Sequence, residues 1–151
     1  MGRLIKPGTI QAVMQSHSVV TTHKGGLAFS SAIGNHTLLM DASQEHGGQD
    51  LGASPKRLML ASLAGCTGID VVMLLDKMKA SFSDFSIDVE AELSADHPKI
   101  YTHVTLVYRI RMKEAERPKM EKAVQMSQEK YCGVSAMFKA FASLDHEIIY
   151  L

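Results

Sequence analysis

The sequence has no excess of charge of either sign. Its 151 residues include 16 lysines and arginines and 16 aspartates and glutamates, which leaves a formal net charge of zero. Proteins that bind DNA or RNA usually gather positive charge to contact the phosphates. We therefore expect no nucleic-acid partner and no attachment to an anionic membrane surface.

Cysteine is also scarce. The two cysteines, Cys66 and Cys132, stand 66 positions apart, so neither belongs to a local CxxC motif of the zinc or thioredoxin type. Residues 1–8 contain no apolar stretch of the kind found in secretory signals, and we expect a cytoplasmic protein. In a reducing compartment, two cysteines are more often free, catalytic or redox-sensing than structural.

Patterns of metal ligands are missing as well. The seven histidines are scattered, with no pair at HxxxH spacing and none beside a cysteine. This lack of ligand spacing argues against a zinc site built from Cys66, Cys132 and a loop histidine. We expect no metal and no cofactor.

One long apolar run is present, from residue 58 to residue 75. Asp70 inside it costs about 2.5–3.5 kcal/mol on membrane-insertion scales, and basic residues stand at both ends of the run. We therefore predict no membrane span, but a helix from Pro55 to about residue 80 that protein buries on nearly all sides. A small domain has difficulty covering such a helix alone, which predicts an obligate homodimer.

The rest of the sequence alternates between strand and helix patterns. Alternating apolar and polar residues predict two paired strands, and Gly34 with Asn35 is a two-residue turn signal between two further strands. The expected elements are strands at 9–22, 26–33, 36–43, 85–93, 104–112 and 144–151, helices from 118 and near 134–141, and a mobile surface loop at 43–53. With 46% hydrophobic residues, this order predicts a single α+β domain over 1–151 with mainly antiparallel sheets.

Two motifs resemble those of a known family. The segments at 54–58 (SPKRL) and 61–67 (ASLAGCT) resemble the central-helix signature of the OsmC/Ohr family, and 131–135 (YCGVS) resembles its second-cysteine motif. The order of elements around the motifs also matches, so the resemblance covers essentially the whole chain. It implies an OsmC-like swapped homodimer with antiparallel sheets around long central helices.

The resemblance implies a thiol-dependent peroxidase. In that family the first cysteine attacks a hydroperoxide as a thiolate and becomes a sulfenic acid, which the second cysteine resolves as a disulfide that dithiols reduce. Cys66 would then be the peroxidatic residue and Cys132 the resolving one, with organic or hydrogen peroxide as substrate and a dithiol as reductant. The chemistry requires a thiolate and a second thiol within reach, with Cα atoms within about 7 Å in the oxidised state.

The sequence departs from the family pattern where the thiolate is activated. Peroxide-reducing members use a glutamate ten residues before the first cysteine and an arginine from the preceding loop. Position 56 is a lysine here, and the loop at 43–53 contains no arginine. The activating pair is either missing or inverted, with Lys56 or Arg57 as the cation and Glu45 or Asp50 as the anion.

Asp70 lies one helical turn after Cys66. Its negative charge would raise the pKa of that thiol unless a cation neutralises it. We assign Asp70 an interfacial structural role.

Two other functions stay open at this point. One is a non-catalytic OsmC-like dimer that binds a small apolar or acidic ligand in the same pocket, which the missing glutamate and arginine favour. The other is a hotdog-type thioesterase, which also wraps a long helix in antiparallel sheet. The paired cysteines argue against the thioesterase.

Overall fold

A computed structural model describes residues 15–151 and confirms the α+β class and the expected order of helices and strands. The chain divides into two compact units, the first ending at Ser54 and the second comprising Pro55–Leu151. The prediction that 1–151 forms a single domain stays a prediction.

The first unit is a three-stranded antiparallel sheet in the order β1-β2-β3. The Gly34-Asn35 turn is confirmed, because Ile33 at the end of β2 pairs with His36 at the start of β3. The first strand had been expected at 9–22. Its residues up to 14 lie outside the described chain, and the strand observed begins only at Val20. The strands are β1 (Val20–Gly25), β2 (Ala28–Ile33) and β3 (His36–Met40).

The loop at 43–53 lies on the surface, as expected, and it is folded around one buried carboxylate. Asp41 accepts hydrogen bonds from the backbone N–H groups of Ala42, Gln49 and Leu51 at 2.8, 3.1 and 3.2 Å. Burial alone would raise the pKa of Asp41, but these three donors outweigh it and the pKa is lowered. A short 3-10 turn, η1 (Gln44–His46), lies within the loop.

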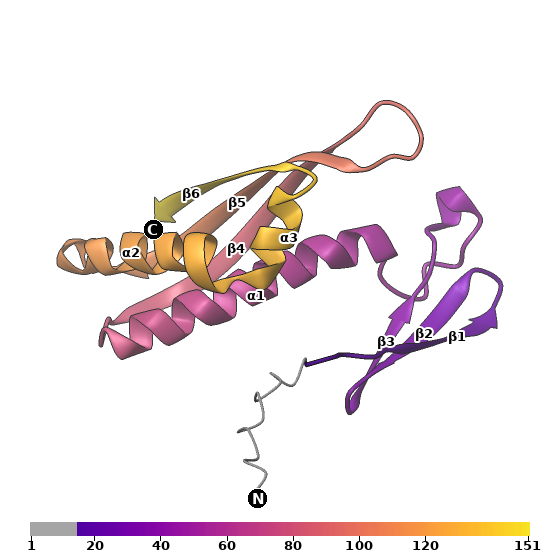
Figure 1. Ribbon diagram of the computed structural model, residues 1–151, viewed down its shortest axis with the longest axis horizontal. Helices are drawn as coiled ribbons and strands as arrows, with labels where there is room; N and C mark the ends of the chain where they lie inside the picture. Colours follow the sequence, from indigo (N-terminus) through magenta and orange to yellow (C-terminus); the bar gives the residue numbers. More distant parts are fainter. Residues whose placement is uncertain (1–14) are drawn as a thin grey trace, which may run out of the picture. The chain divides into compact units, whose positions relative to one another are not determined.

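The second unit packs three helices against a three-stranded sheet in the order β4-β5-β6 (Figure 1). The pairing of β4 with β5 is antiparallel, as expected. The pairing of β5 with β6 is parallel, so this sheet is mixed rather than antiparallel throughout. The helices α2 and α3 connect β5 to β6 and return the chain to the end of the sheet at which β5 begins, so β6 runs parallel to β5. The elements are α1 (Pro55–Lys77), β4 (Phe82–Leu93), β5 (Tyr101–Met112), η2 (Glu114–Glu116), α2 (Arg117–Met126), the π-helical turn η3 (Ser127–Tyr131), α3 (Gly133–Lys139) and β6 (Ser143–Tyr150).

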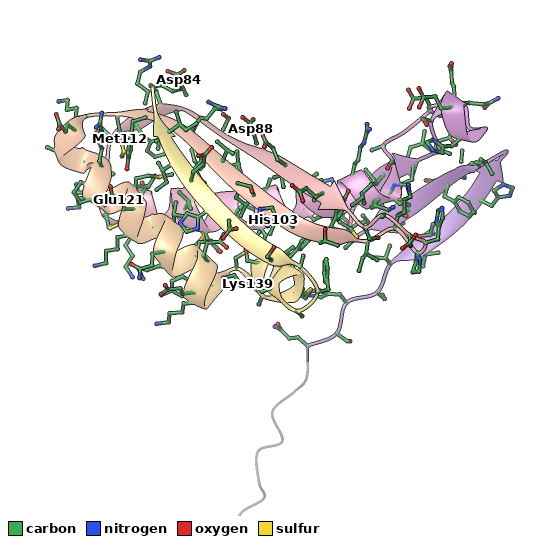
Figure 2. The ribbon with its side chains drawn as sticks, turned by 90° about the horizontal axis from the view of Figure 1, so that it is seen from above. Asp84, Asp88, His103, Met112, Glu121 and Lys139 are labelled. Atoms are coloured by element: carbon green, nitrogen blue, oxygen red, sulfur yellow. The ribbon has the colours of Figure 1, made fainter. Side chains whose placement is uncertain are left out.

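The core of this unit lies between the sheet and the helices. Alternate residues of β5 point into it, as the sequence pattern predicted, while the opposite face of the sheet carries charged side chains such as Asp84 and Asp88 (Figure 2). These acids pair with Arg111 and Arg109 at 2.8 and 2.7 Å. The largest fully buried apolar core side chains are Tyr108, Leu63, Leu75, Leu106, Ile110, Met120, Val71, Val104 and Val124.

A single chain does not cover α1, in agreement with the expectation that one small domain has difficulty burying this helix alone, and burial on nearly all sides by a second chain stays a prediction. Only one face is buried, formed by Leu63, Thr67, Val71 and Leu75 at intervals of four residues. On the other faces, apolar side chains are exposed, among them Met59 (44%), Ile69 (63%), Val72 (40%) and Met73 (66%). By length and composition α1 could also cross a membrane, a test that core helices of soluble proteins meet as well.

Candidate active site

The fold brings the two cysteines together. Cys66 lies in the middle of α1, and Cys132 immediately precedes α3, which packs against α1. Both are free thiols, and Cys132 is buried whereas Cys66 is partly exposed. The two sulfur atoms and a carboxylate oxygen of Asp70 all lie within 4.8 Å of one another.

The start of α3 faces both sulfur atoms. Cys132 is its N-cap residue, and the Cys132 Sγ accepts a hydrogen bond from the backbone N–H of Ser135 at 3.3 Å. The backbone N–H of Val134, in the first turn of the same helix, lowers the pKa of the Cys66 thiol. The prediction that Cys132 stands directly before a helix is thus confirmed, and the same helix start also contacts Cys66.

The surroundings of Cys66 favour the neutral thiol. Desolvation by burial is the largest cause and raises its pKa above the ordinary cysteine value. The backbone N–H of Val134 opposes this, while the neighbouring Cys132 and the charge of Asp70 raise the pKa further. The sequence-based expectation that Asp70 raises this pKa is confirmed.

Asp70 connects the thiols to a buried polar network. Its Oδ2 accepts a hydrogen bond from Ser127 Oγ at 3.0 Å, and Ser127 Oγ lies 2.9 Å from Thr67 Oγ1. Thr67 Oγ1 is also 2.6 Å from the Tyr108 hydroxyl, and Gln128 Nε2 donates to both, at 3.1 and 2.9 Å. Burial raises the pKa of Tyr108, which keeps its hydroxyl protonated.

Sequence reasoning did not identify this network. Thr67 follows Cys66 directly in the motif, which is the one signal that marked it. Ser127 and Gln128 are both buried and lie at the start of the π-helical turn η3.

Lys56 and Arg57 lie at the exposed start of α1. They precede Cys66 by ten and nine residues, which is about 14–15 Å along a helix axis. Neither is among the groups that set the pKa of Cys66. The Lys56 carbonyl accepts a hydrogen bond from the Tyr101 hydroxyl at 3.1 Å. Within the described part of one chain, the structure therefore does not bring these cations to the thiol, and their activating role stays a prediction.

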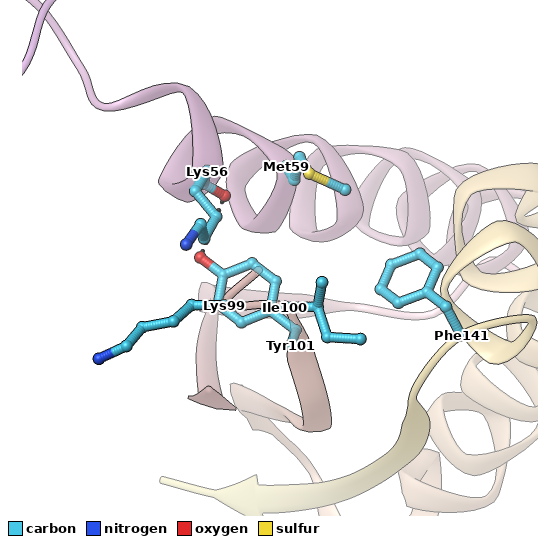
Figure 3. Close-up of a pocket in the computed structure, with 6 residues that line it drawn as sticks. All are labelled: Lys56, Met59, Lys99, Ile100, Tyr101 and Phe141. Atoms are coloured by element: carbon cyan, nitrogen blue, oxygen red, sulfur yellow. Dashed lines mark hydrogen bonds between the residues drawn. The ribbon is translucent and has the colours of Figure 1, made fainter. Parts of the chain in front are cut away.

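An apolar pocket of about 330 Å³ opens beside the start of α1. Figure 3 shows Met59 on α1 above Ile100, with Phe141 on one side and Tyr101 beneath Lys56 on the other. Met59 precedes Cys66 by seven residues, so both lie on the same face of α1. The pocket is lined by Lys56, Met59, Lys99, Ile100, Tyr101 and Phe141.

Comparison with known proteins places these features in a family context. The family model described as OsmC-like protein matches residues 47–147, a segment that includes both cysteines and Asp70. Protein YhfA of Escherichia coli K12 is 29% identical over 122 residues, which cover 80% of this chain and 88% of that protein.

Solved structures show the same fold. A hypothetical protein from Aquifex aeolicus superimposes with a TM-score of 0.75 at 26% identity, covering 91% of this chain and 99% of its own. An organic hydroperoxide resistance protein OsmC from Legionella pneumophila superimposes with a TM-score of 0.64 at 18% identity, covering 92% of this chain and 99% of its own.

Proposed function

This chain belongs to the OsmC-like protein family, and on that premise we propose that it reduces hydroperoxides with the thiols of Cys66 and Cys132. The observation that carries the proposal is the approach of the two sulfur atoms to within 4.8 Å, from positions far apart in the sequence. The name of the Legionella pneumophila protein, which refers to organic hydroperoxide resistance, supports the same chemistry.

The proposed reaction has two oxidative steps and one reductive step. The Cys66 thiolate attacks the terminal oxygen of R–O–O–H, so that an S–O bond forms, the O–O bond breaks and an alcohol leaves. The Cys132 thiolate then attacks the sulfenic sulfur, forming the disulfide and releasing water. A dithiol reductant restores both thiols by exchange and is itself oxidised to a disulfide.

The difference in burial between the cysteines supports this assignment of roles. Cys66 is partly exposed, so a peroxide can reach its sulfur, whereas Cys132 is only 4% exposed. A disulfide has an S–S distance of about 2.05 Å, which the two side chains can reach by a short approach.

The apolar pocket favours an organic hydroperoxide over hydrogen peroxide. Because Met59 and Cys66 share one face of α1, a substrate with an apolar tail in the pocket would lie along the face that carries the thiol. The reducing cytoplasm that we propose as its location would also maintain the dithiol reductant.

A swapped homodimer completes this proposal. The exposed apolar faces of α1 need cover, and a second copy of the chain would supply it. The raised pKa of Cys66 also calls for a positive charge near the sulfur. Lys56 or Arg57 can provide this charge only if dimerisation brings one of them to the thiol of the other chain.

Turnover kinetics test the proposal. Reduced wild type, Cys66→Ser and Cys132→Ser are each mixed with an organic hydroperoxide and a dithiol, and peroxide consumption is followed. We expect measurable but weak activity in wild type and none in Cys66→Ser. Cys132→Ser should permit the first oxidation without the intramolecular disulfide. Equal, slow rates for wild type and Cys66→Ser would refute the enzymatic function.

The raised pKa of Cys66 favours a second candidate function, a non-catalytic dimer that binds a small ligand in the apolar pocket. The two lysines among the lining residues, Lys56 and Lys99, suit a ligand with an apolar body and an acidic group. If this function is correct, a fatty acid binds wild type and Cys66→Ser equally, and Phe141→Ala weakens binding in both.

A further inference from the structure

Three metal-ligating groups converge in the second unit. Cys66 and Asp70 are four residues apart on α1 and therefore lie on one face of that helix. Cys132 lies immediately before α3 and contributes the third group of the cluster from a second helix. Their ligand atoms lie within 4.8 Å of one another. Sequence reasoning sought the third ligand among the histidines, but the fold provides a carboxylate instead.

The cluster lacks a compensating cation in the described chain. Among residues 15–151, the ion pairs involve other acids, and Asp70 is in none of them. Deprotonation of both thiols would place two thiolates beside a carboxylate, which is unfavourable without a positive charge. A bound divalent cation removes this repulsion and bonds to all three groups.

The donor set indicates which cation. Two sulfur ligands argue against Mg²⁺ and Ca²⁺, which bind through oxygen. Zn²⁺ accepts thiolate and carboxylate together, with Zn–S bonds near 2.3 Å and Zn–O bonds of about 2.0–2.2 Å. In a tetrahedron with such bonds the ligand atoms lie roughly 3.4–3.8 Å apart. Because the observed separations do not exceed 4.8 Å, small side-chain rotations suffice to reach that geometry.

Groups behind the cluster already hold the ligands in place. Ser127 Oγ donates to Asp70 Oδ2 at 3.0 Å, which leaves the other carboxylate oxygen free to bind a metal ion. The backbone N–H of Ser135 donates to the Cys132 sulfur at 3.3 Å. Such supporting hydrogen bonds orient metal ligands and raise the affinity of a site.

We propose that reduced Cys66 and Cys132, together with Asp70, bind one Zn²⁺ per chain, with the fourth position of the tetrahedron open to solvent. Binding releases the two thiol protons, and no electrons are transferred. Zinc and the Cys66–Cys132 disulfide exclude each other, because both use the same sulfur electron pairs. Bound zinc therefore protects the thiols from oxidation, and a chain whose cysteines have already formed the disulfide cannot bind zinc at this site. The proposal does not rest on peroxidase activity.

Cobalt and zinc titrations of the reduced full-length protein test the site. Anaerobic Co²⁺ should produce thiolate-to-cobalt charge-transfer bands and the intense d–d bands of a tetrahedral centre, saturating at one Co²⁺ per chain. Zn²⁺ should bleach these bands. Cys66→Ser and Cys132→Ser should each abolish the charge-transfer signal of a two-thiolate site while retaining the far-ultraviolet circular dichroism of the wild type.

The carboxylate has a matched control on the same helix. Asp70→Asn removes the third ligand, whereas Asp76→Asn changes an exposed aspartate ten residues after Cys66. We expect Asp70→Asn to weaken Zn²⁺ binding at least tenfold in competition with a chromogenic chelator, because even loss of a supporting group typically costs 10–100-fold in affinity. Asp76→Asn should bind like the wild type.

Equal Zn²⁺ affinities for Asp70→Asn and Asp76→Asn would overturn the proposed ligand set, as would cobalt bands that persist without Cys132. Peroxide oxidation of the chelator-treated protein is measured separately. If the protein binds one Zn²⁺ per chain but peroxide does not oxidise it, the metal site stands and the peroxidase function is refuted. If peroxide oxidises the protein but zinc does not bind, the peroxidase function stands and the metal site is refuted.

Discussion

At the scale of single residues, Cys66 is held between opposing influences. Burial, Cys132 and Asp70 raise its pKa, and the backbone N–H of Val134 lowers it, with the net shift upward. A thiol in this state is a weak nucleophile near neutral pH, because only the thiolate attacks peroxides and alkylating agents.

Replacing Asp70 with asparagine should make Cys66 more reactive. In metal-free wild type, alkylation of Cys66 should rise with pH, with a midpoint above the ordinary cysteine pKa of about 8.5. Asp70→Asn removes the charge that raises this pKa, so the midpoint moves to lower pH and the rate at pH 7 increases. Iodoacetamide labelling with peptide mass spectrometry measures both, with Asp76→Asn as control. Identical profiles for the two variants, or a wild-type midpoint below the ordinary value, would contradict this electrostatic description.

The sequence could identify the thiols but not all of their neighbours. The motifs around Cys66 and Cys132 predicted a shared site, and the fold brings the two residues together. Asp70 was assigned to an interface, although its carboxylate lies beside both sulfur atoms. Its distance from Cys132 depends on how α3 packs against α1, and a helical period on α1 alone carries no information about that packing.

At the scale of elements, local patterns were reliable where one face of an element is buried by its own chain. The alternation in β5 matches the burial of its alternate residues from Val104 to Ile110, although Val107 between them is buried as well, and α2 buries one apolar face. That face does not continue regularly to Tyr131, which is 48% exposed at the end of the π turn that begins at Ser127. The parallel pairing of β6 likewise depends on the path of the crossover, which apolar spacing does not encode.

The buried hydroxyl of Tyr108 should contribute to the stability of the packing between α1, β5 and η3. Tyr108→Phe removes one hydrogen bond each from the side chains of Thr67 and Gln128. Water cannot replace these bonds easily, because Thr67 is 0% and Gln128 8% exposed. We expect the free energy of unfolding to fall by about 1–3 kcal/mol in urea denaturation. Tyr131→Phe removes an exposed hydroxyl and should change it by less than about 0.5 kcal/mol. Equal values for the two variants would show that the network adds nothing to stability.

At the scale of the whole molecule, the exposed faces of α1 are the part of the fold that bears on assembly into a dimer. A single chain buries one face of this helix and leaves Ile69, Val72 and Met73 exposed. Its uniformly apolar composition led to the expectation that a second copy of the chain covers the faces that one chain leaves exposed. The missing cover is the reason for proposing a homodimer.

Sedimentation should therefore show a dimer at micromolar concentration. Met73→Glu places a charge on the exposed apolar face of α1 and should shift the equilibrium toward monomer, because burying an unpaired carboxylate is strongly unfavourable. Ser86→Glu adds the same charge to an exposed position of β4 and should leave the assembly unchanged. A stable folded monomer in the wild type, or equal behaviour of the two variants, would refute this interface.

The most direct test of the proposed redox pair is the loss of free thiols when metal-free, reduced protein meets one equivalent of an organic hydroperoxide. We expect both thiols to disappear together, the intact mass to fall by two hydrogen atoms, and a non-reducing digest to contain the Cys66–Cys132 disulfide. In Cys132→Ser, the mass should instead increase by one oxygen atom, located on Cys66. Two free thiols and an unchanged mass after prolonged exposure would contradict the account of Cys66 and Cys132 as a peroxide-reducing pair.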